Sequence, residues 1–198
     1  MFSKANSDRR KRAARKPNKP KVRRRTRPMA GLAAGVIGGL VATWVLDNYQ
    51  RGAVAATRGG EKAAGLDPVV SEQQAEQQRH QERAHGEVAQ RVTRAISGKG
   101  LTSRQRRQAA PYVHYAVGAI AGGIYGFSVE IVPVVRTGYG TGYASLLFLG
   151  GPDLLVPWLN LGPAPRETTQ AVQAGGLSAH LIYGATLETM RRMLRWLF

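Results

Sequence analysis

The sequence predicts an all-α integral membrane protein with about four transmembrane helices, a disordered basic N-terminal tail and a polar helical insert. Three observations indicate this fold class: apolar segments recur along the chain, strongly polar segments separate them, and positive charge is concentrated before the first apolar segment. The 198 residues carry 29 Lys and Arg against 12 acids, a formal charge of +17 that favours an anionic partner. The lack of cysteine excludes disulfides, thiolate metal sites and cysteine nucleophiles.

Residues 1–28 form the predicted basic tail, with 13 Lys and Arg, a single acid and three prolines. Such a segment buries too little apolar surface to offset the entropy of ordering, so we expect it to be disordered. We expect residues 4–27 to lie against the anionic headgroups of a lipid bilayer. Nucleic acid is the weaker alternative partner, because no aromatic side chain within this basic run could stack on bases.

Residues 29–46 contain no ionisable group and form the first predicted transmembrane helix. As a helix they would be roughly 27 Å long, close to the ~30 Å thickness of the hydrocarbon core. Trp44 and Tyr49 stand at the far end, where interfacial aromatic side chains are common. A cleaved signal peptide is the alternative, but the small-residue site at 53–55 lies well beyond the apolar segment. We therefore expect an uncleaved anchor.

Residues 47–110 form the predicted polar, largely helical insert, with 11 Lys and Arg and 7 acids. Asp67-Pro68 is typical of a helix start, and Gly98-Lys99-Gly100 of a helix end. Apolar residues near that end predict a helix that packs by its last turns: Val88, Val92, Ala95 and Ile96. His80 and His85 are about 140° apart on a helix, so we interpret them as two exposed side chains and not as a metal site.

Three more apolar segments, 111–135, 142–161 and 177–198, predict transmembrane helices 2, 3 and 4. Helix 3 is expected to be broken, because Gly150-Gly151-Pro152-Asp153 lies within it. Three arginines near the end of helix 4 could reach the headgroups while their apolar neighbours stay in lipid: Arg191, Arg192 and Arg195. A large buried helical domain of a soluble protein is the alternative to four spans.

The distribution of Lys and Arg predicts that both termini are cytoplasmic, because the basic tail precedes an even number of spans. Six basic residues before helix 2 would then lie on the opposite side: Arg91, Arg94, Lys99, Arg104, Arg106 and Arg107. Loops beyond about 60 residues escape the charge rule, and the insert is near that length. The side of the insert therefore stays open.

Glycines recur at every fourth residue in the first two predicted spans: Gly31, Gly35 and Gly39, then Gly118, Gly122 and Gly126. Without a Cβ atom, such a row lets two helix backbones approach closely, and dispersion then drives association in lipid. We expect these residues to pack helices together. A homo-oligomer is also left open.

Five ionisable residues in or near the predicted spans are functional candidates: Glu130, Asp153, His180, Glu188 and His114. An ion pair with Arg136 is the simplest role for Glu130, and Asp153 could cap a half-helix. Together the five could form a proton or cation relay. No sequence pattern of a catalytic, cofactor or metal site is present, so we do not expect an enzyme.

Four segments resemble the YagU family of small bacterial inner-membrane proteins: GLAAGV at 31–36, YGFSVEIVP at 125–133, PDLLVPWLNLGPAP at 152–165 and SAHLIYGATLETMRRMLR at 178–195. The resemblance implies a multi-pass protein of the bacterial inner membrane. The molecular function of that family is unknown, so the resemblance implies only that Glu130, His180 and Glu188 are worth testing.

Three functions follow from these observations. The first is an inner-membrane protein with a structural or interaction role. The second is a small transporter or proton- or ion-conducting protein that uses the intramembrane acids. The third and weakest is a membrane-tethered nucleic-acid binder.

Overall fold

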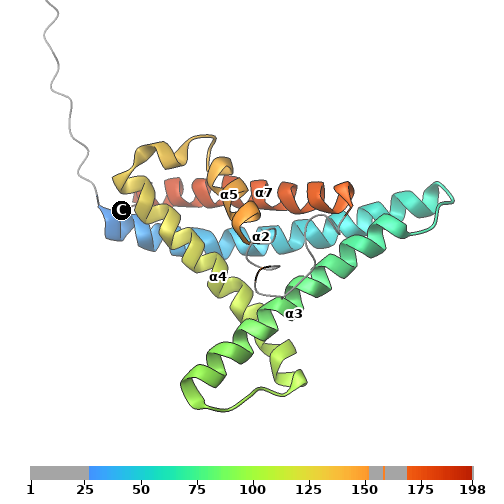
Figure 1. Cartoon of the computed structure of the whole chain (residues 1–198). Coiled ribbons are helices and arrows are strands. Elements are labelled where there is room, and N and C mark those ends of the chain that lie inside the picture. The colour runs from blue at the N-terminus through green and yellow to red at the C-terminus, as the bar shows by residue number, and fades with distance from the viewer. Residues whose placement is uncertain (1–26, 152–157, 159–168, 198) are drawn as a thin grey trace, which may run out of the picture.

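The computed structural model describes residues 27–151, 158 and 169–197 (Figure 1). Within them the chain is helical and contains no strand, which confirms the predicted all-α class. The elements are α2 (Pro28–Ala63), α3 (Val69–Ser97), α4 (Ser103–Ile131), the 3₁₀ helix η1 (Pro133–Arg136), α5 (Thr141–Gly150) and α7 (Gln170–Leu197). The predicted basic tail, Asp153 and most of the second half of the third predicted span lie outside the described residues.

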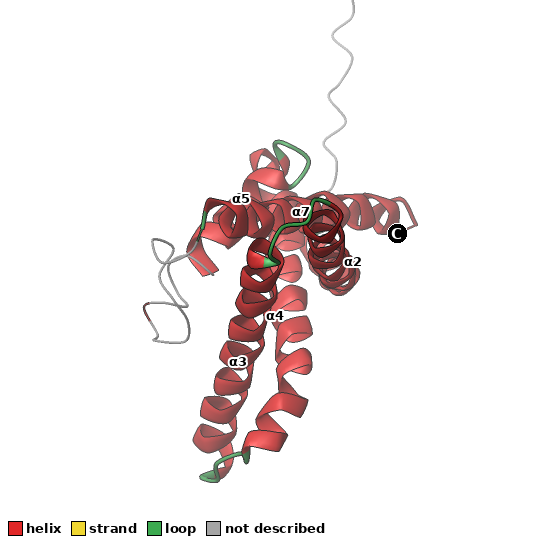
Figure 2. Ribbon diagram, turned by 90° about the vertical axis from the view of Figure 1, so that its right-hand side faces the viewer, coloured by secondary structure: helices red, strands yellow, loops and turns green. Residues whose placement is uncertain are grey.

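Helix α2 is the central element. It packs against α4 and α7, while α3 packs mainly against α4 and α5 against α7. Figure 1 shows α7 beside α2, with α4 crossing α2 at an angle. Figure 2 shows that α3 and the first half of α4 extend together away from α2 and α7. The N-terminus of α2 and the C-termini of α4 and α7 therefore meet at one end of the molecule.

Helix α2 continues well past the predicted end of the first span at residue 46. Its 36 residues run unbroken to Ala63, roughly 54 Å. The predicted boundary between span and insert is wrong as a helix boundary, because the change at Asp47 is one of polarity alone. No proline lies between residues 47 and 63 to interrupt the backbone hydrogen bonds.

Helix α3 begins and ends where the sequence indicates, after Pro68 and at Gly98, whose φ of 69° is left-handed. Its packing differs from the prediction. Val92 and Ile96 in its last turns are 52% and 82% exposed. The buried positions are Ser71 and three small residues in its second half: Ala84, Gly86 and Ala89. Small side chains decide the contact, since a Cβ on Gly86 would lie 3.1 Å from the carbonyl oxygen of Arg106 in α4.

Helix α4 differs at both ends from the second predicted span, 111–135. It begins eight residues earlier, where Thr102 and Gln105 form a reciprocal capping box. Pro111 is accommodated inside the helix. The helix ends at Ile131, and Pro133 begins η1, because proline cannot continue the α-helical hydrogen bonds.

Helix α5 has ten residues and ends at Gly150, where the sequence predicts a break. It is roughly 15 Å long, about half of the hydrocarbon thickness. Helix α7 begins at Gln170, seven residues before the predicted start of the fourth span. In the described part of the chain, α2 alone combines the length and apolar composition needed to cross a membrane, and α5 is a shorter apolar helix.

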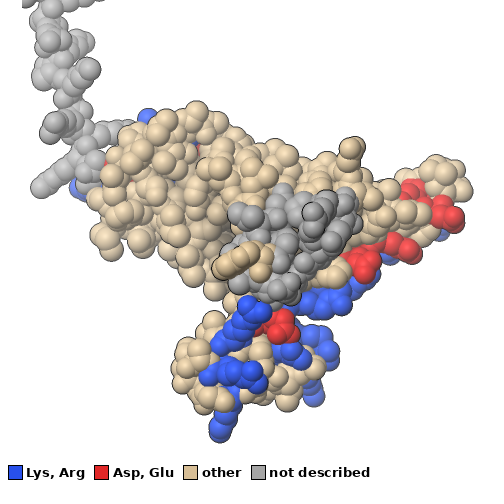
Figure 3. Space-filling view, viewed as in Figure 1, with Lys and Arg blue, Asp and Glu red and all other residues tan. Residues whose placement is uncertain are grey.

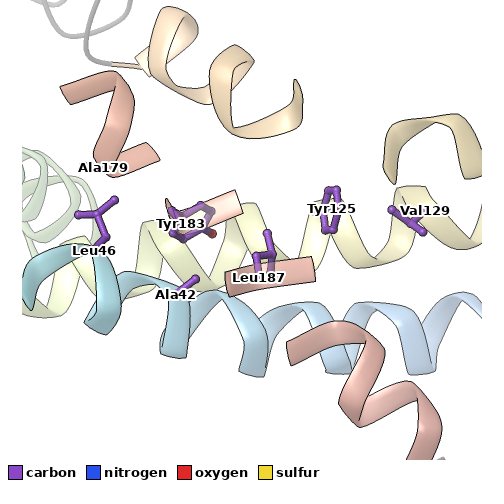
Figure 4. Close-up of a cluster of buried hydrophobic side chains, with 7 residues drawn as sticks. All are labelled: Ala42, Leu46, Tyr125, Val129, Ala179, Tyr183 and Leu187. Carbon is purple, nitrogen blue, oxygen red and sulfur yellow. The ribbon is translucent and has the colours of Figure 1, made fainter. Parts of the chain in front are cut away.

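The buried core lies between α2, α4 and α7 (Figure 4). Its members are Ala42, Leu46, Tyr125, Val129, Ala179, Tyr183 and Leu187. The Tyr183 hydroxyl donates a hydrogen bond to the Gly118 carbonyl at 2.7 Å. This bond satisfies a polar group inside the core and ties α7 to α4.

Candidate functional site

The two glycine rows face each other across the α2–α4 contact. A Cβ on Gly35 would overlap the carbonyl oxygen of Gly122, and one on Gly39 would overlap that of Gly118. The third pair is Gly31 and Gly126, where an added Cβ on either would meet the other's carbonyl oxygen. The two helices run in opposite directions with their backbones in direct contact. Only glycine fits at these positions without a shift of the helices.

Glu188 lies at the centre of an ionic cluster near the C-terminus of α7. Its side chain is fully buried and accepts bonds from two arginines of the next turn. Arg191 reaches it with Nε at 2.7 Å and Nη2 at 3.0 Å, and Arg192 with Nε at 2.6 Å. The Tyr125 hydroxyl of α4 donates to Oε2 at 3.0 Å. Both carboxylate oxygens are therefore bonded to charged donors.

Glu130 of α4 belongs to the same cluster. Arg195 of α7 donates to it from Nε at 2.9 Å and Nη2 at 3.2 Å. Arg191 lies 3.7 Å away, and the backbone N–H of Arg27 donates to Oε2 at 3.3 Å. The prediction that Glu130 pairs with Arg136 is wrong. Arg136 is exposed in η1, whereas the Glu130 carboxylate faces α7.

Arg191 connects the two acids, because it lies within ion-pair distance of both. Its side chain is 7% exposed, so it does not extend toward headgroups as the sequence suggested. Arg192 is half-exposed, and its guanidinium lies 4.4 Å from the centre of the Tyr139 ring. Two carboxylates and three guanidiniums leave the cluster with one net positive charge.

A second group of polar side chains lies at the other end of the α2–α4 contact. His114 Nε2 of α4 is 2.9 Å from Asp47 Oδ1 of α2, and the ring of His85 in α3 is 4.8 Å from that of His114. Burial lowers the pKa of His85 to about 4, with repulsion from His114 adding to the shift and Asp47 opposing it. The interpretation of His85 as exposed is wrong, because α4 covers it. His80 is also partly buried, with Nε2 3.8 Å from Glu76.

His180 lies apart from both groups. Its Nδ1 is 2.9 Å from the Gly176 carbonyl oxygen, and its ring packs on Phe148 of α5 at 5.2 Å. Of the four candidates that the structure describes, only Glu130 and Glu188 come together. His114 and His180 occupy separate sites, so these four do not form a continuous relay. Among the described residues no group of three or more His, Asp or Glu side chains could hold a metal ion.

Sequence reasoning missed several members of these clusters, among them Asp47, His85 and Tyr125. The arginines at three, four and seven residues after Glu188 were a usable signal, because the first two spacings place oppositely charged side chains together on a helix. No local signal connects Tyr125 or Glu130 to α7, since those contacts join residues more than 60 positions apart.

Comparison of the chain with protein-family models, with curated proteins and with solved structures gives no match. The resemblance to the YagU family therefore rests on the four sequence segments alone.

Proposed function

We propose that the chain is a multi-pass protein of the bacterial inner membrane with a structural or interaction role. One observation carries this proposal, namely the distribution of apolar side chains. The core of α2, α4 and α7 is built largely from glycine, alanine and tyrosine. Large apolar residues instead cover the outside of these three helices: Met29, Ile37, Leu40, Trp44, Val117, Ile120, Ile124, Phe127, Ile131, Leu177, Met193, Trp196 and Leu197. A lipid environment accounts for such exposure, whereas water would penalise it.

The charge distribution supports the same environment. On the face drawn in Figure 3, the part of the molecule formed by the first half of α2, the second half of α4, α5 and α7 shows few charged side chains. Lys, Arg, Asp and Glu gather instead on α3 and on the parts of α2 and α4 beside it. A boundary between a body with few charges on its surface and a charged remainder is expected at a membrane surface.

The length of the uncharged segment also supports a bilayer. The ionic cluster lies beside Gly31 at one end of the α2–α4 contact, and Asp47 and His114 lie at the other. Asp47 is sixteen positions after Gly31. This is roughly 24 Å of helix, which approaches the ~30 Å thickness of the hydrocarbon core. Charged groups at both ends then lie near headgroup depth, away from the centre of the hydrocarbon core.

The proposed orientation places both termini in the cytoplasm. The arginine-rich cluster, the start of α2 and the end of α7 share one end of the molecule, and the basic tail joins it through Arg27. Positive charge favours the cytoplasmic side. Residues 142–161 are proposed to form the third, broken span. The YagU resemblance is part of this proposal.

The bonding of the buried acids favours a structural role over conduction. A conducting carboxylate must exchange protons or ions, whereas Glu188 is bonded to two arginines and a tyrosine. Glu130 is bonded to Arg195 and to backbone. These contacts join α4, α7 and the start of α2, which is what a structural ion cluster does.

Cysteine labelling tests the proposed topology, because the native chain has no cysteine and supplies the background control. Leu66→Cys reports the α2–α3 turn, and Thr137→Cys the turn after η1, both at exposed positions. In intact cells a membrane-impermeant thiol reagent is expected to label position 66. Position 137 is expected to react only after the membrane is permeabilised.

Labelling of both positions in intact cells, or of neither, would overturn the proposed path of α2 and α4. Release of the protein from membranes by alkaline carbonate would overturn integral insertion itself.

A further inference from the structure

The acids and the cations of the insert are unevenly distributed along its length. Residues 47–87 hold all seven acids of the insert and five Lys and Arg, whereas residues 88–110 hold six Lys and Arg and no acid. We name residues 88–110, the end of α3 and the start of α4, the basic arm. Figure 3 shows blue side chains gathered on the lower lobe, and most of the red ones toward the turn between α2 and α3.

Most cations of the basic arm have no ion-pair partner among the residues that the structure describes. Arg106 pairs with Glu87, which precedes the arm. Four others are exposed and form no ion pair within the described parts of the chain: Arg94, Lys99, Arg104 and Arg107. Like charges on one short segment repel one another, and an anionic surface would relieve the repulsion.

The basic arm and the turn of α4 after it also expose apolar side chains. Val92 is 52% exposed, Ile96 82% and Tyr112 79%. Exposed basic and apolar side chains along one helical segment are typical of segments that lie in the headgroup region of a bilayer. Tyrosine is favoured at that depth, because its ring enters the apolar region and its hydroxyl stays hydrated. Free nucleic acid would leave Val92 and Ile96 in water.

The basic arm lies to one side of α2 and not along its axis. The part of α4 that precedes the Asp47–His114 contact extends away from α2 and α7, with α3 beside it (Figures 1 and 2). The second half of α2 continues along its own axis and carries the α2–α3 turn away from the basic arm. The cationic surface thus lies beside α2, whereas the α2–α3 turn lies further along the α2 axis.

We propose that the basic arm docks on the anionic phospholipid headgroups of the leaflet at the Asp47 end of α2. This inference rests on the proposed function, because it requires α2 to cross the bilayer. It assigns lipid contact to a segment distant from the N-terminal tail, on the opposite side of the membrane. The contact would hold α3 and α4 at a constant angle to the membrane plane.

The test uses the full chain reconstituted into bilayers of phosphatidylcholine, alone or mixed equally with phosphatidylglycerol. An environment-sensitive dye is attached to a single cysteine in each protein, at Ser97→Cys, Leu66→Cys or Leu40→Cys. With phosphatidylglycerol, iodide quenching at position 97 is expected to fall by about threefold or more and to recover at high salt. Position 66 should stay accessible in both bilayers, and position 40 protected in both.

A charge-neutralised arm provides the matched comparison. This variant combines Arg94→Gln, Arg104→Gln and Arg107→Gln, and it should abolish the protection at position 97. The control variant removes three exposed cations elsewhere on α2 and α3 by combining Arg58→Gln, Lys62→Gln and Arg79→Gln. It should leave the protection at position 97 unchanged.

The outcomes separate this inference from the proposed function. Full iodide access at position 97 with position 40 protected would overturn docking and leave insertion intact. Access at position 40 would overturn insertion, and docking with it. Protection at 97 that appears only when single-stranded DNA is added, and not with phosphatidylglycerol, would reject lipid in favour of nucleic acid.

Discussion

The two ends of the α2–α4 contact are closed by different chemistry. At one end, Glu130 lies among guanidinium groups that stay charged at any physiological pH. At the other, Asp47 meets His114, with His85 packed behind it. Arginine keeps its charge when the solution is acidified, whereas His85, whose pKa burial lowers to about 4, gains one. The α2–α4 contact therefore has permanently charged arginines at one end and titratable histidines at the other.

The largest expected effect comes from separating both ends at once. Gly122 lies between them, and a Cβ there would overlap the Gly35 carbonyl oxygen. Gly122→Leu should lower the free energy of unfolding by more than about 3 kcal/mol, because the backbones must move apart and neither end can then close. Thermal unfolding in detergent, followed by tryptophan fluorescence, measures this loss. An unchanged midpoint would show that the two glycine rows do not hold the helices together.

A smaller loss is expected when only the ionic end is broken. Glu188→Gln removes a fully buried charge and leaves the buried guanidinium of Arg191 without its nearest carboxylate. Breaking a buried pair in this way should cost about 3 kcal/mol. The same unfolding measurement applies.

Glu87→Gln is the matched control for that change. It breaks an ion pair with Arg106 in which both side chains are a third or more exposed, and should cost less than about 1 kcal/mol. Equal losses for the two variants would mean that burial of the Glu188 cluster adds nothing to stability.

The histidine end should respond to pH. The pKa of His85 is about 4 in the folded chain and 6.5 as its ordinary value, so protonation favours the unfolded chain. The contribution of neutral His85 to the free energy of unfolding is fully present above pH 6.5 and is lost as the pH falls toward 4. The loss is about 1 kcal/mol at pH 5.5. Denaturation in detergent at pH 7.5 and pH 5.5 measures the difference.

Because Asp47 and His114 face His85 from α2 and α4, they also affect this pH response, and the His85→Gln variant isolates the contribution of His85. That variant should lose about 1 kcal/mol less than the native chain between the two pH values. An identical loss in both proteins would assign the acid response to other groups.

The smallest expected effect has the opposite sign. Gly59 lies on the exposed second half of α2, and a Cβ there would contact nothing within 4 Å. Gly59→Ala should stabilise the chain by about 0.5–1 kcal/mol, because alanine loses less conformational freedom in a helix. Destabilisation there would show that the second half of α2 has a contact absent from this structure.

Local features of the sequence were sufficient for part of the fold. Asp67-Pro68 and Gly98 marked the ends of α3, because start and stop signals act within a few residues. The four-residue glycine spacing marked the faces that pack, because it follows from the helical repeat alone. The end of α2 was misplaced, because hydropathy reports which solvent a helix meets and not where its hydrogen bonds stop.

The sequence predicted the two acids of the candidate site but not their partners. Glu130 and Glu188 were identified because charges are rare in apolar segments. Their partners were not, since the partner of Glu130 depends on where α7 lies, 65 residues away in the chain. His85 was misinterpreted for the same reason. Its neighbours along α3 are mostly polar and indicated an exposed side chain, whereas contact with α4 buries it.

By itself, the sequence determined the helical class, the bounds of α3, the glycine faces and the division of charge along the chain. These are properties of short segments, set by backbone propensity, helical spacing and composition. Only the tertiary structure decided that the two glycine rows meet, that Arg191 joins two acids, and that the basic arm turns sideways from α2. Those results depend on distances between residues far apart in the chain, which are set when the helices pack.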